Sequence, residues 1–137
     1  MINFNILDPN DFHNLESKEE KEKYIQKIKE AIKNTDNEII KKMANIVKRN
    51  VKHYQNDFYV YDLHMIKKYT GPFLWMTRET GTDFIPLKHL KGALIDFYNY
   101  VKYTNEHFYL YDGHRLKKIS FEEMEKLVDQ HKKLLTS

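Results

Sequence analysis

The sequence predicts an α+β fold with about four helices and a mainly antiparallel sheet of about six short strands, in the order ααββββαββα. At three places a Ser or Thr is followed three residues later by Glu, before apolar residues at helical spacing. Elsewhere, short aromatic and β-branched runs are separated by turn residues. The stretch FYVYDLHMIKK at 58–68 also returns as FYLYDGHRLKK at 108–118, with seven of eleven positions identical.

The chain is expected to begin with an irregular segment, 1–16, that contains a turn at Asp8–Asp11. Ser17 and Glu20 then form a capping box, in which the serine hydroxyl accepts from the Glu20 amide. The apolar residues that follow recur at helical spacing, and they predict an amphipathic helix over 18–34.

A second capping box, Thr35 to Glu38, predicts another helix over 39–54. From Asn56 the apolar pattern changes to short runs that end at turn residues. Strands are therefore expected at 57–61, 65–69, 73–78 and 82–86. Leucine and aromatic residues then return to helical spacing over 87–101.

The second copy of the repeated stretch is predicted to be a hairpin of strands 107–111 and 115–119, joined by a three-residue loop. A third capping box, Ser120 to Glu123, opens the last helix, whose apolar positions continue to Leu134. A helix followed by a hairpin would then occur twice, which suggests an internal duplication, although two copies are thin support for a repeat architecture.

The strand pattern predicts that each hairpin has one aliphatic face and one face of tyrosine and cationic side chains. One interpretation is an exposed tyrosine–cation surface that binds a partner. The alternative, which we favour, is that the tyrosines pack beneath a helix with their hydroxyl groups at the rim. Trp75, inside the apolar run PFLWM, is expected in the core.

Length and composition set broad limits on the protein. The 137 residues fit a single domain, and the absence of cysteine excludes disulfides and thiolate metal sites. There is no signal-peptide pattern and no apolar run of about eighteen residues, so a cytoplasmic protein is expected, in a bacterium or a phage-infected cell. The 20 Lys against 3 Arg, with abundant Ile and Asn, fit an AT-rich genome of the kind that phages and plasmids often have.

Our main functional hypothesis is a non-catalytic protein that acts by protein–protein contact, as an inhibitor or adaptor of a host nucleic-acid-handling or defence enzyme. Tyrosine and arginine are enriched in protein interfaces, and a homodimer is compatible with the repeat. The candidate contact residues are Tyr59, Tyr61, Arg78, Glu79, Asp83, Tyr109, Tyr111 and Arg115.

The alternative is a nucleic-acid-binding protein. The predicted helix 39–54 carries five cationic residues and no acidic one, which is typical of a phosphate-facing surface. A solvated helix face in a lysine-rich protein would look the same. The candidate residues are Lys41, Lys42, Lys48, Arg49, Lys52, Lys67 and Lys117.

A third hypothesis is a small metal-assisted enzyme. The pairs Asp62/His64 and Asp112/His114 could form a mixed nitrogen and oxygen site if their loops met. No ligand spacing such as HExxH accompanies them, and Asp before Gly is itself a common loop pair. Nucleophile-elbow, P-loop and dinucleotide-binding motifs are absent. The sequence therefore favours no catalytic residue, metal or cofactor.

Overall fold

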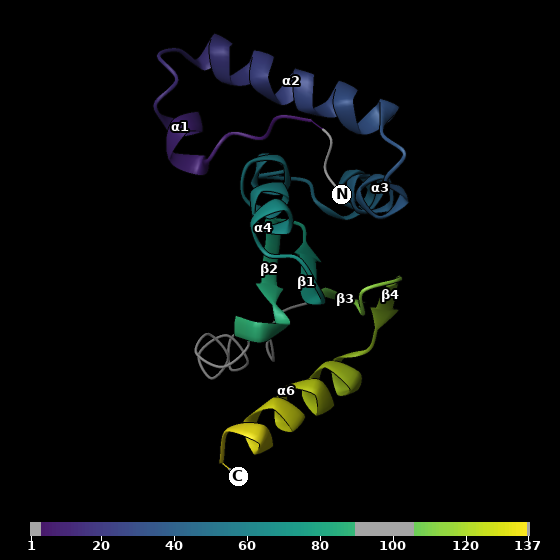
Figure 1. Ribbon diagram of the computed structural model, residues 1–137. Helices are drawn as coiled ribbons and strands as arrows, with labels where there is room; N and C mark the ends of the chain where they lie inside the picture. The colour runs from purple at the N-terminus through teal and green to yellow at the C-terminus, as the bar shows by residue number, and fades with distance from the viewer. Residues whose placement is uncertain (1–3, 90–105, 137) are drawn as a thin grey trace. The chain divides into compact units, whose positions relative to one another are not determined.

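The structure is a computed structural model that describes residues 4–89 and 106–136 (Figure 1). The chain forms two compact units. The first comprises the residues up to Thr70 together with Glu79–Thr82, and the second comprises the remainder. The described residues form both helices and strands, which confirms the α+β class. The expectation of a single domain stays a prediction.

The first unit is helical. Its elements are α1 (Pro9–His13), α2 (Lys18–Asn34), α3 (Glu38–Asn50), the π-helix η1 (Phe58–Asp62) and α4 (Leu63–Lys68). The core contains Ile28 and Ile32 of α2, Met43 and Val47 of α3, and Phe58 of η1, all buried. The spacing of these residues on α2 and α3 is four, so each helix turns one apolar stripe inward.

Helix α2 begins where the sequence predicts, because the Glu20 amide donates to the Ser17 hydroxyl at 3.1 Å. The second capping box is wrong. Asn37 caps α3 instead, accepting from the amides of Ile39 and Ile40. An Asn side chain at this position satisfies two of the amides that the first helical turn leaves without a partner.

Two helix boundaries in this unit also differ from prediction. Helix α1 replaces part of the irregular N-terminal segment, since the Asp8 side chain caps it and Pro9 occupies its first turn. Helix α3 ends at Asn50 rather than at Tyr54. The reason is that the amides of Lys52 and His53 donate to the Glu79 carbonyl, at 2.9 and 2.8 Å, instead of continuing the helix.

The first copy of the repeated stretch is a helix, so the two strands predicted at 57–61 and 65–69 are wrong. The Leu63 amide donates to the carbonyl of Phe58, five residues earlier, which is the π-helical pattern. Phe58, Asp62, Leu63 and Ile66 are buried, and this spacing places them on one side of a helix. The structure therefore does not confirm a helix–hairpin duplication.

The second unit is built on a four-stranded sheet of order β2-β1-β3-β4. Its elements are β1 (Phe73–Arg78), β2 (Gly81–Pro86), the 3-10 helix η2 (Leu87–His89), β3 (His107–Tyr111), β4 (Leu116–Ile119) and α6 (Phe121–Thr136). Strand β3 pairs antiparallel with β1 and with β4, so it lies inside the sheet. Four of the six predicted strands are thus confirmed.

One side of the sheet packs against α6. Leu74, Met76, Phe108 and Ile119 form a buried cluster with Met124, and Phe121 and Leu127 pack against it. The third capping box is confirmed in both directions: the Glu123 amide donates to Ser120 Oγ at 3.1 Å, and the Ser120 amide donates to Glu123 Oε1 at 3.3 Å. The predicted helix over 87–101 is described only at Leu87–His89, and the rest lies outside the described residues.

The register of the β3–β4 hairpin differs by one residue from prediction. Tyr111 pairs with Leu116 and Phe108 with Ile119, so the connection has four residues, Asp112–Arg115. The Asp112 carboxylate accepts hydrogen bonds from the amides of His114 and Arg115, at 2.8 and 2.9 Å. Arg115 is therefore part of the turn and not of β4. A one-residue slip exchanges the two faces of a strand, and the predicted partners on β4 change accordingly.

Candidate anion-binding site

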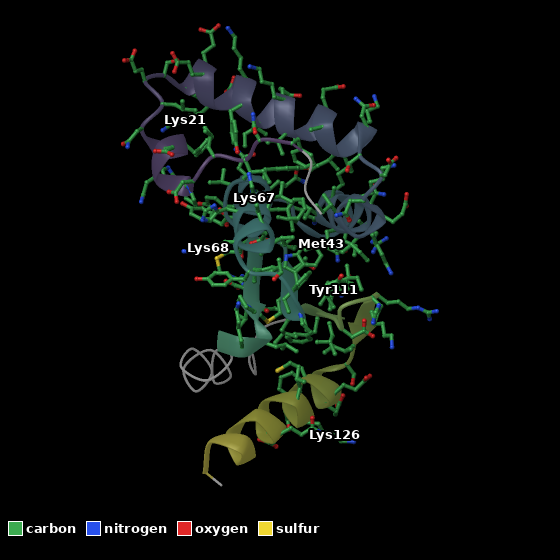
Figure 2. All side chains as sticks on the ribbon, in the orientation of Figure 1. Lys21, Met43, Lys67, Lys68, Tyr111 and Lys126 are labelled. Atoms are coloured by element: carbon green, nitrogen blue, oxygen red, sulfur yellow. The ribbon has the colours of Figure 1, made fainter. Side chains whose placement is uncertain are left out.

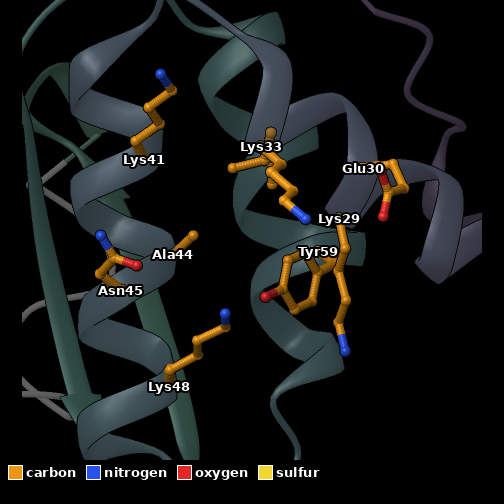
Figure 3. A pocket seen from close by; sticks show the side chains of 9 residues that line it. Lys29, Glu30, Lys33, Lys41, Ala44, Asn45, Lys48 and Tyr59 are labelled. Carbon is orange, nitrogen blue, oxygen red and sulfur yellow. The ribbon is translucent and has the colours of Figure 1, made fainter.

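A pocket of about 470 Å³ lies in the first unit, between α2, α3 and the π-helix (Figure 3). Lys29 and Lys33 of α2 line one side, and Lys41 and Lys48 of α3 line the other. Spacings of four and seven residues keep each pair on one helix face. The remaining lining residues are Glu30, Ile32, Ala44, Asn45 and Tyr59.

The buried stripes of the two helices explain why the lysines gather here. Ile28 and Ile32 of α2, and Met43 and Val47 of α3, are held in the core. Lys29 is three residues from the buried Ile32 of α2. Lys41 and Lys48 are three and four residues from the buried Ala44 of α3, so the lysines border the apolar stripes. Long lysine stems can then pack along the apolar border while the ammonium groups stay in water.

The four ammonium groups differ in their contacts. Lys41 Nζ lies 3.8 Å from Glu38 Oε1, and Lys29 Nζ lies 5.4 Å from the centroid of the Tyr59 ring. Lys33 and Lys48 are exposed and form no ion pair with any residue in the described part of the chain. Among the described residues, only Lys41 of the four lysines is thus paired with a carboxylate.

Tyr59 comes from the π-helix and lies between the lysines of the two helices (Figure 3). The residue is 2% exposed, and desolvation by burial raises the pKa of its phenol above the usual value. The phenol therefore keeps its proton at neutral pH and can donate a hydrogen bond to an anion. With one carboxylate, from Glu30, against four ammonium groups, the pocket favours anionic ligands.

The other predicted nucleic-acid residues are more scattered. Lys42 and Arg49 are exposed on α3, and Lys67 is exposed on α4, where Figure 2 labels it. Lys52 is paired with Glu79 at 3.2 Å. Lys117 belongs to the second unit and lies 3.7 Å from Asp112. The pocket thus includes Lys41 and Lys48 from the predicted set.

Three of the tyrosines in the repeated stretch are buried, as the favoured interpretation expects, so the alternative of an exposed tyrosine–cation surface is wrong for these residues. Tyr59, Tyr109 and Tyr111 are 2%, 3% and 9% exposed. In the second unit, the rings of Tyr109 and Tyr111 lie 5.5 and 5.0 Å from those of Trp75 and Phe73, centroid to centroid. Strand β3 is flanked on both edges, which places these rings among neighbours on the sheet.

The remaining protein-contact candidates are in different environments. Tyr61 is 42% exposed, and its hydroxyl lies 2.6 Å from His13 Nε2. Arg78 is paired with both Asp83 and Glu106. Glu79 is exposed beside Lys52, and Arg115 is exposed in the β3–β4 turn. Their role in binding a protein stays a prediction.

The two Asp–His pairs also have separate structural roles. The buried Asp62 carboxylate accepts from the Thr82 hydroxyl at 2.6 Å, whereas Asp112 caps its turn. His64 Nε2 lies 3.7 Å from Asp8 Oδ2. Across residues 4–89 and 106–136, no group of three His, Cys, Asp or Glu residues is placed to hold a metal ion. In the same residues, no helix has the length and apolar character needed to cross a membrane.

Sequence reasoning missed Lys29, Lys33 and the position of Tyr59 in the pocket. Lys29 and Lys33 are four residues apart in the half of α2 that has a single acidic residue, Glu30. That spacing could have indicated a second cationic face. The pairing of α2 with α3 and the helical state of Tyr59 could not be found from charge pattern alone.

Compared with known proteins, the chain matches no family model, no curated protein and no solved structure.

Proposed function

We propose that the protein is a non-catalytic nucleic-acid-binding protein that holds backbone phosphates at the pocket between α2 and α3. The observation that carries this proposal is the convergence of four lysines from two helices on one pocket. Lysine supplies a compact point charge, whereas arginine reads phosphates and base edges with a planar fork. We therefore expect binding that depends on phosphate charge and varies little with base sequence.

The rest of α3 supports a wider contact. Lys42 and Arg49 are exposed on this helix, which has one acidic residue, Glu38, in its first turn. Each phosphate neutralised by a cationic side chain releases condensed counterions, and this release drives binding at low salt. Cationic residues in and beside the pocket can thus contact neighbouring phosphates of the same strand.

The proposal is tested by fluorescence anisotropy with labelled mixed-sequence oligonucleotides, single- and double-stranded, between about 50 and 200 mM salt. The logarithm of the binding constant should fall linearly with the logarithm of salt, by about 0.7 to 0.9 per phosphate contacted. A double variant, Lys33→Gln with Lys48→Gln, should bind more weakly and show a shallower salt slope.

The matched control is Lys23→Gln with Lys27→Gln, which removes the same charge from exposed positions of α2 outside the pocket. It should retain most of the affinity and most of the salt slope. No binding of either oligonucleotide at low salt would refute the proposal. An equal loss of affinity in both double variants would mean that net charge matters and the pocket does not.

Protein contact is a second candidate function, as an inhibitor or adaptor. It is supported by two aromatic side chains of the first unit, Tyr54 and Tyr61, which are 72% and 42% exposed. Exposed tyrosine is enriched in protein interfaces. In affinity capture, a protein recovered with the wild type should be lost when both residues are replaced by Ala. Equal recovery with the variant would exclude this surface.

A further inference from the structure

We propose that the pocket between α2 and α3 receives a terminal phosphate of a nucleic-acid strand. The inference rests on the proposed function and assigns the ligand group of the same site. It differs from general backbone binding in one measurable respect: a strand that ends in a phosphate should bind more tightly than the same strand ending in a hydroxyl group.

Charge is the first argument. An internal phosphodiester carries a single negative charge, whereas a phosphate monoester carries about 1.5 to 2 at pH 7. The lining of the pocket contains four ammonium groups and one carboxylate. Such a concentration of cations around one space matches a multiply charged group better than single charges spread along a strand.

Shape is the second argument. The pocket has walls from α2, α3 and the π-helix, and its volume of about 470 Å³ lies within the usual range for sites that hold small molecules. Figure 3 shows Tyr59 between the lysines of the opposing helices. Because Tyr59 is buried and belongs to the core side of the pocket, we expect the end of a strand to approach the ring more closely than the middle of a strand.

Hydrogen-bond donors are the third argument. A terminal phosphate has three oxygen atoms that accept strong hydrogen bonds. The pocket offers the Tyr59 hydroxyl and the Asn45 side-chain amide in addition to the lysines. Lys29 already lies over the Tyr59 ring, at 5.4 Å, and this cation–π contact holds its ammonium group at the pocket before a ligand arrives.

The experiment compares one short labelled thymidine oligonucleotide in three forms: with a 5′-phosphate, with a 3′-phosphate and with hydroxyl groups at both ends. For the wild-type protein, at least one phosphorylated form should bind about tenfold more tightly than the hydroxyl form. Lys33→Gln with Lys48→Gln should reduce this preference to about twofold or less, while Lys23→Gln with Lys27→Gln should leave it unchanged. Circular dichroism should show that both variants keep their helices.

The outcomes separate this inference from the proposed function. Equal binding of all three forms would overturn the terminal-phosphate assignment and leave nucleic-acid binding intact. No binding of any form would refute both. Competition with thymidine monophosphate identifies the source of the phosphate. If the mononucleotide binds as tightly as the phosphorylated strand, the ligand is a free nucleotide and the strand-end assignment is wrong.

Discussion

The sixth position of the repeated stretch holds Leu63 in the first copy and Gly113 in the second. Leu63 has helical dihedral angles, φ −64° and ψ −38°, and its side chain is fully buried. Gly113 has φ +105°, a conformation that side chains with a Cβ rarely adopt. The residue at the sixth position therefore favours a helix in the first copy, where it is leucine, and a tight turn in the second, where it is glycine. Seven of the other positions are identical in the two copies.

Replacing Gly113 with Leu should destabilise the hairpin by about 1 to 3 kcal/mol through backbone strain. A Cβ at this position would meet no atom beyond its chain neighbours within 4 Å, so the expected cause is backbone strain and not a clash of the Cβ. Urea denaturation of the variant measures the loss. Arg115→Leu is the control, because it adds the same side chain to an exposed position of the same turn. Equal stability of the two variants would refute the strain argument.

Asp112 makes the same turn sensitive to pH. Hydrogen bonds from the backbone amides of Arg115 and His114 hold the pKa of its carboxyl below the usual value of 3.8. Folding therefore favours the ionised form, and the resulting stability is present above about pH 4 and is lost as the pH falls through the lower native pKa. Asp112→Asn should show a smaller loss of stability than the wild type between neutral pH and about pH 3. Equal losses would contradict this role.

At the scale of elements, the capping residues decide where helices begin. The first and third capping boxes were predictable, because Ser17 and Ser120 directly precede their helices. The second was not, since Thr35 and Asn37 are both good capping residues and lie two positions apart. In the structure Asn37 caps α3, while Thr35 Oγ1 accepts from the Asn37 amide at 3.3 Å.

Replacing Asn37 with Ala should destabilise the protein by about 0.5 to 2 kcal/mol, because the amides of Ile39 and Ile40 lose their acceptor. Asn37→Asp is the control, since its carboxylate can accept from the same amides and lies at the positive end of the helix. Thermal denaturation compares the three proteins. An unchanged midpoint for the alanine variant would show that Asn37 is not the effective cap.

The first copy of the repeated stretch shows where prediction from sequence fails. FYVYDLHMIKK has the aromatic and β-branched residues of a strand, and its identity to a hairpin sequence reinforces that interpretation. The same residues also place Phe58, Asp62, Leu63 and Ile66 on one helix face. Tertiary burial decides between these patterns, and burial of Asp62 depends on Thr82, which is distant in sequence.

The candidate site was partly predictable for a related reason. Charge pattern identified α3 and therefore Lys41 and Lys48. Predicting the rest of the pocket would have required knowing that α2 packs against α3 and that Tyr59 lies in a π-helix. Both depend on long-range packing, which the charge pattern does not contain.

At the scale of the whole molecule, the short segment Glu79–Thr82 lies in the sequence between two parts of the second unit. Its first two residues connect β1 to β2, and its last two begin β2. All four belong to the first unit, whereas β1 and the rest of β2 belong to the second. There the Glu79 carbonyl accepts from Lys52 and His53, and the Thr82 hydroxyl donates to Asp62. A Cβ on Gly81, which has φ +143°, would come within 3.0 Å of Asp57 Oδ2. The segment is thus closely fitted among these residues.

Thr82→Val should therefore destabilise the first unit by about 1 to 3 kcal/mol, because it removes a hydrogen bond to a buried carboxylate. Both Thr82 and Asp62 are buried, so water does not readily replace the lost donor. Thr80→Val is the control, since Thr80 is exposed on the same segment. Urea denaturation, monitored by far-ultraviolet circular dichroism, measures the stability of both variants. A loss as large for Thr80→Val as for Thr82→Val would contradict the proposed role.

The same segment has a consequence for how this chain can be divided. Its backbone passes from one unit to the other after Thr70, after Arg78 and after Thr82. No single cleavage site yields two complete pieces: a fragment ending at Thr70 lacks the acceptor for two amides after α3 and the donor to Asp62. Neither unit can be exchanged as a cassette by a simple fusion. We expect recombination within the gene to be tolerated only where both crossings of this segment are inherited together.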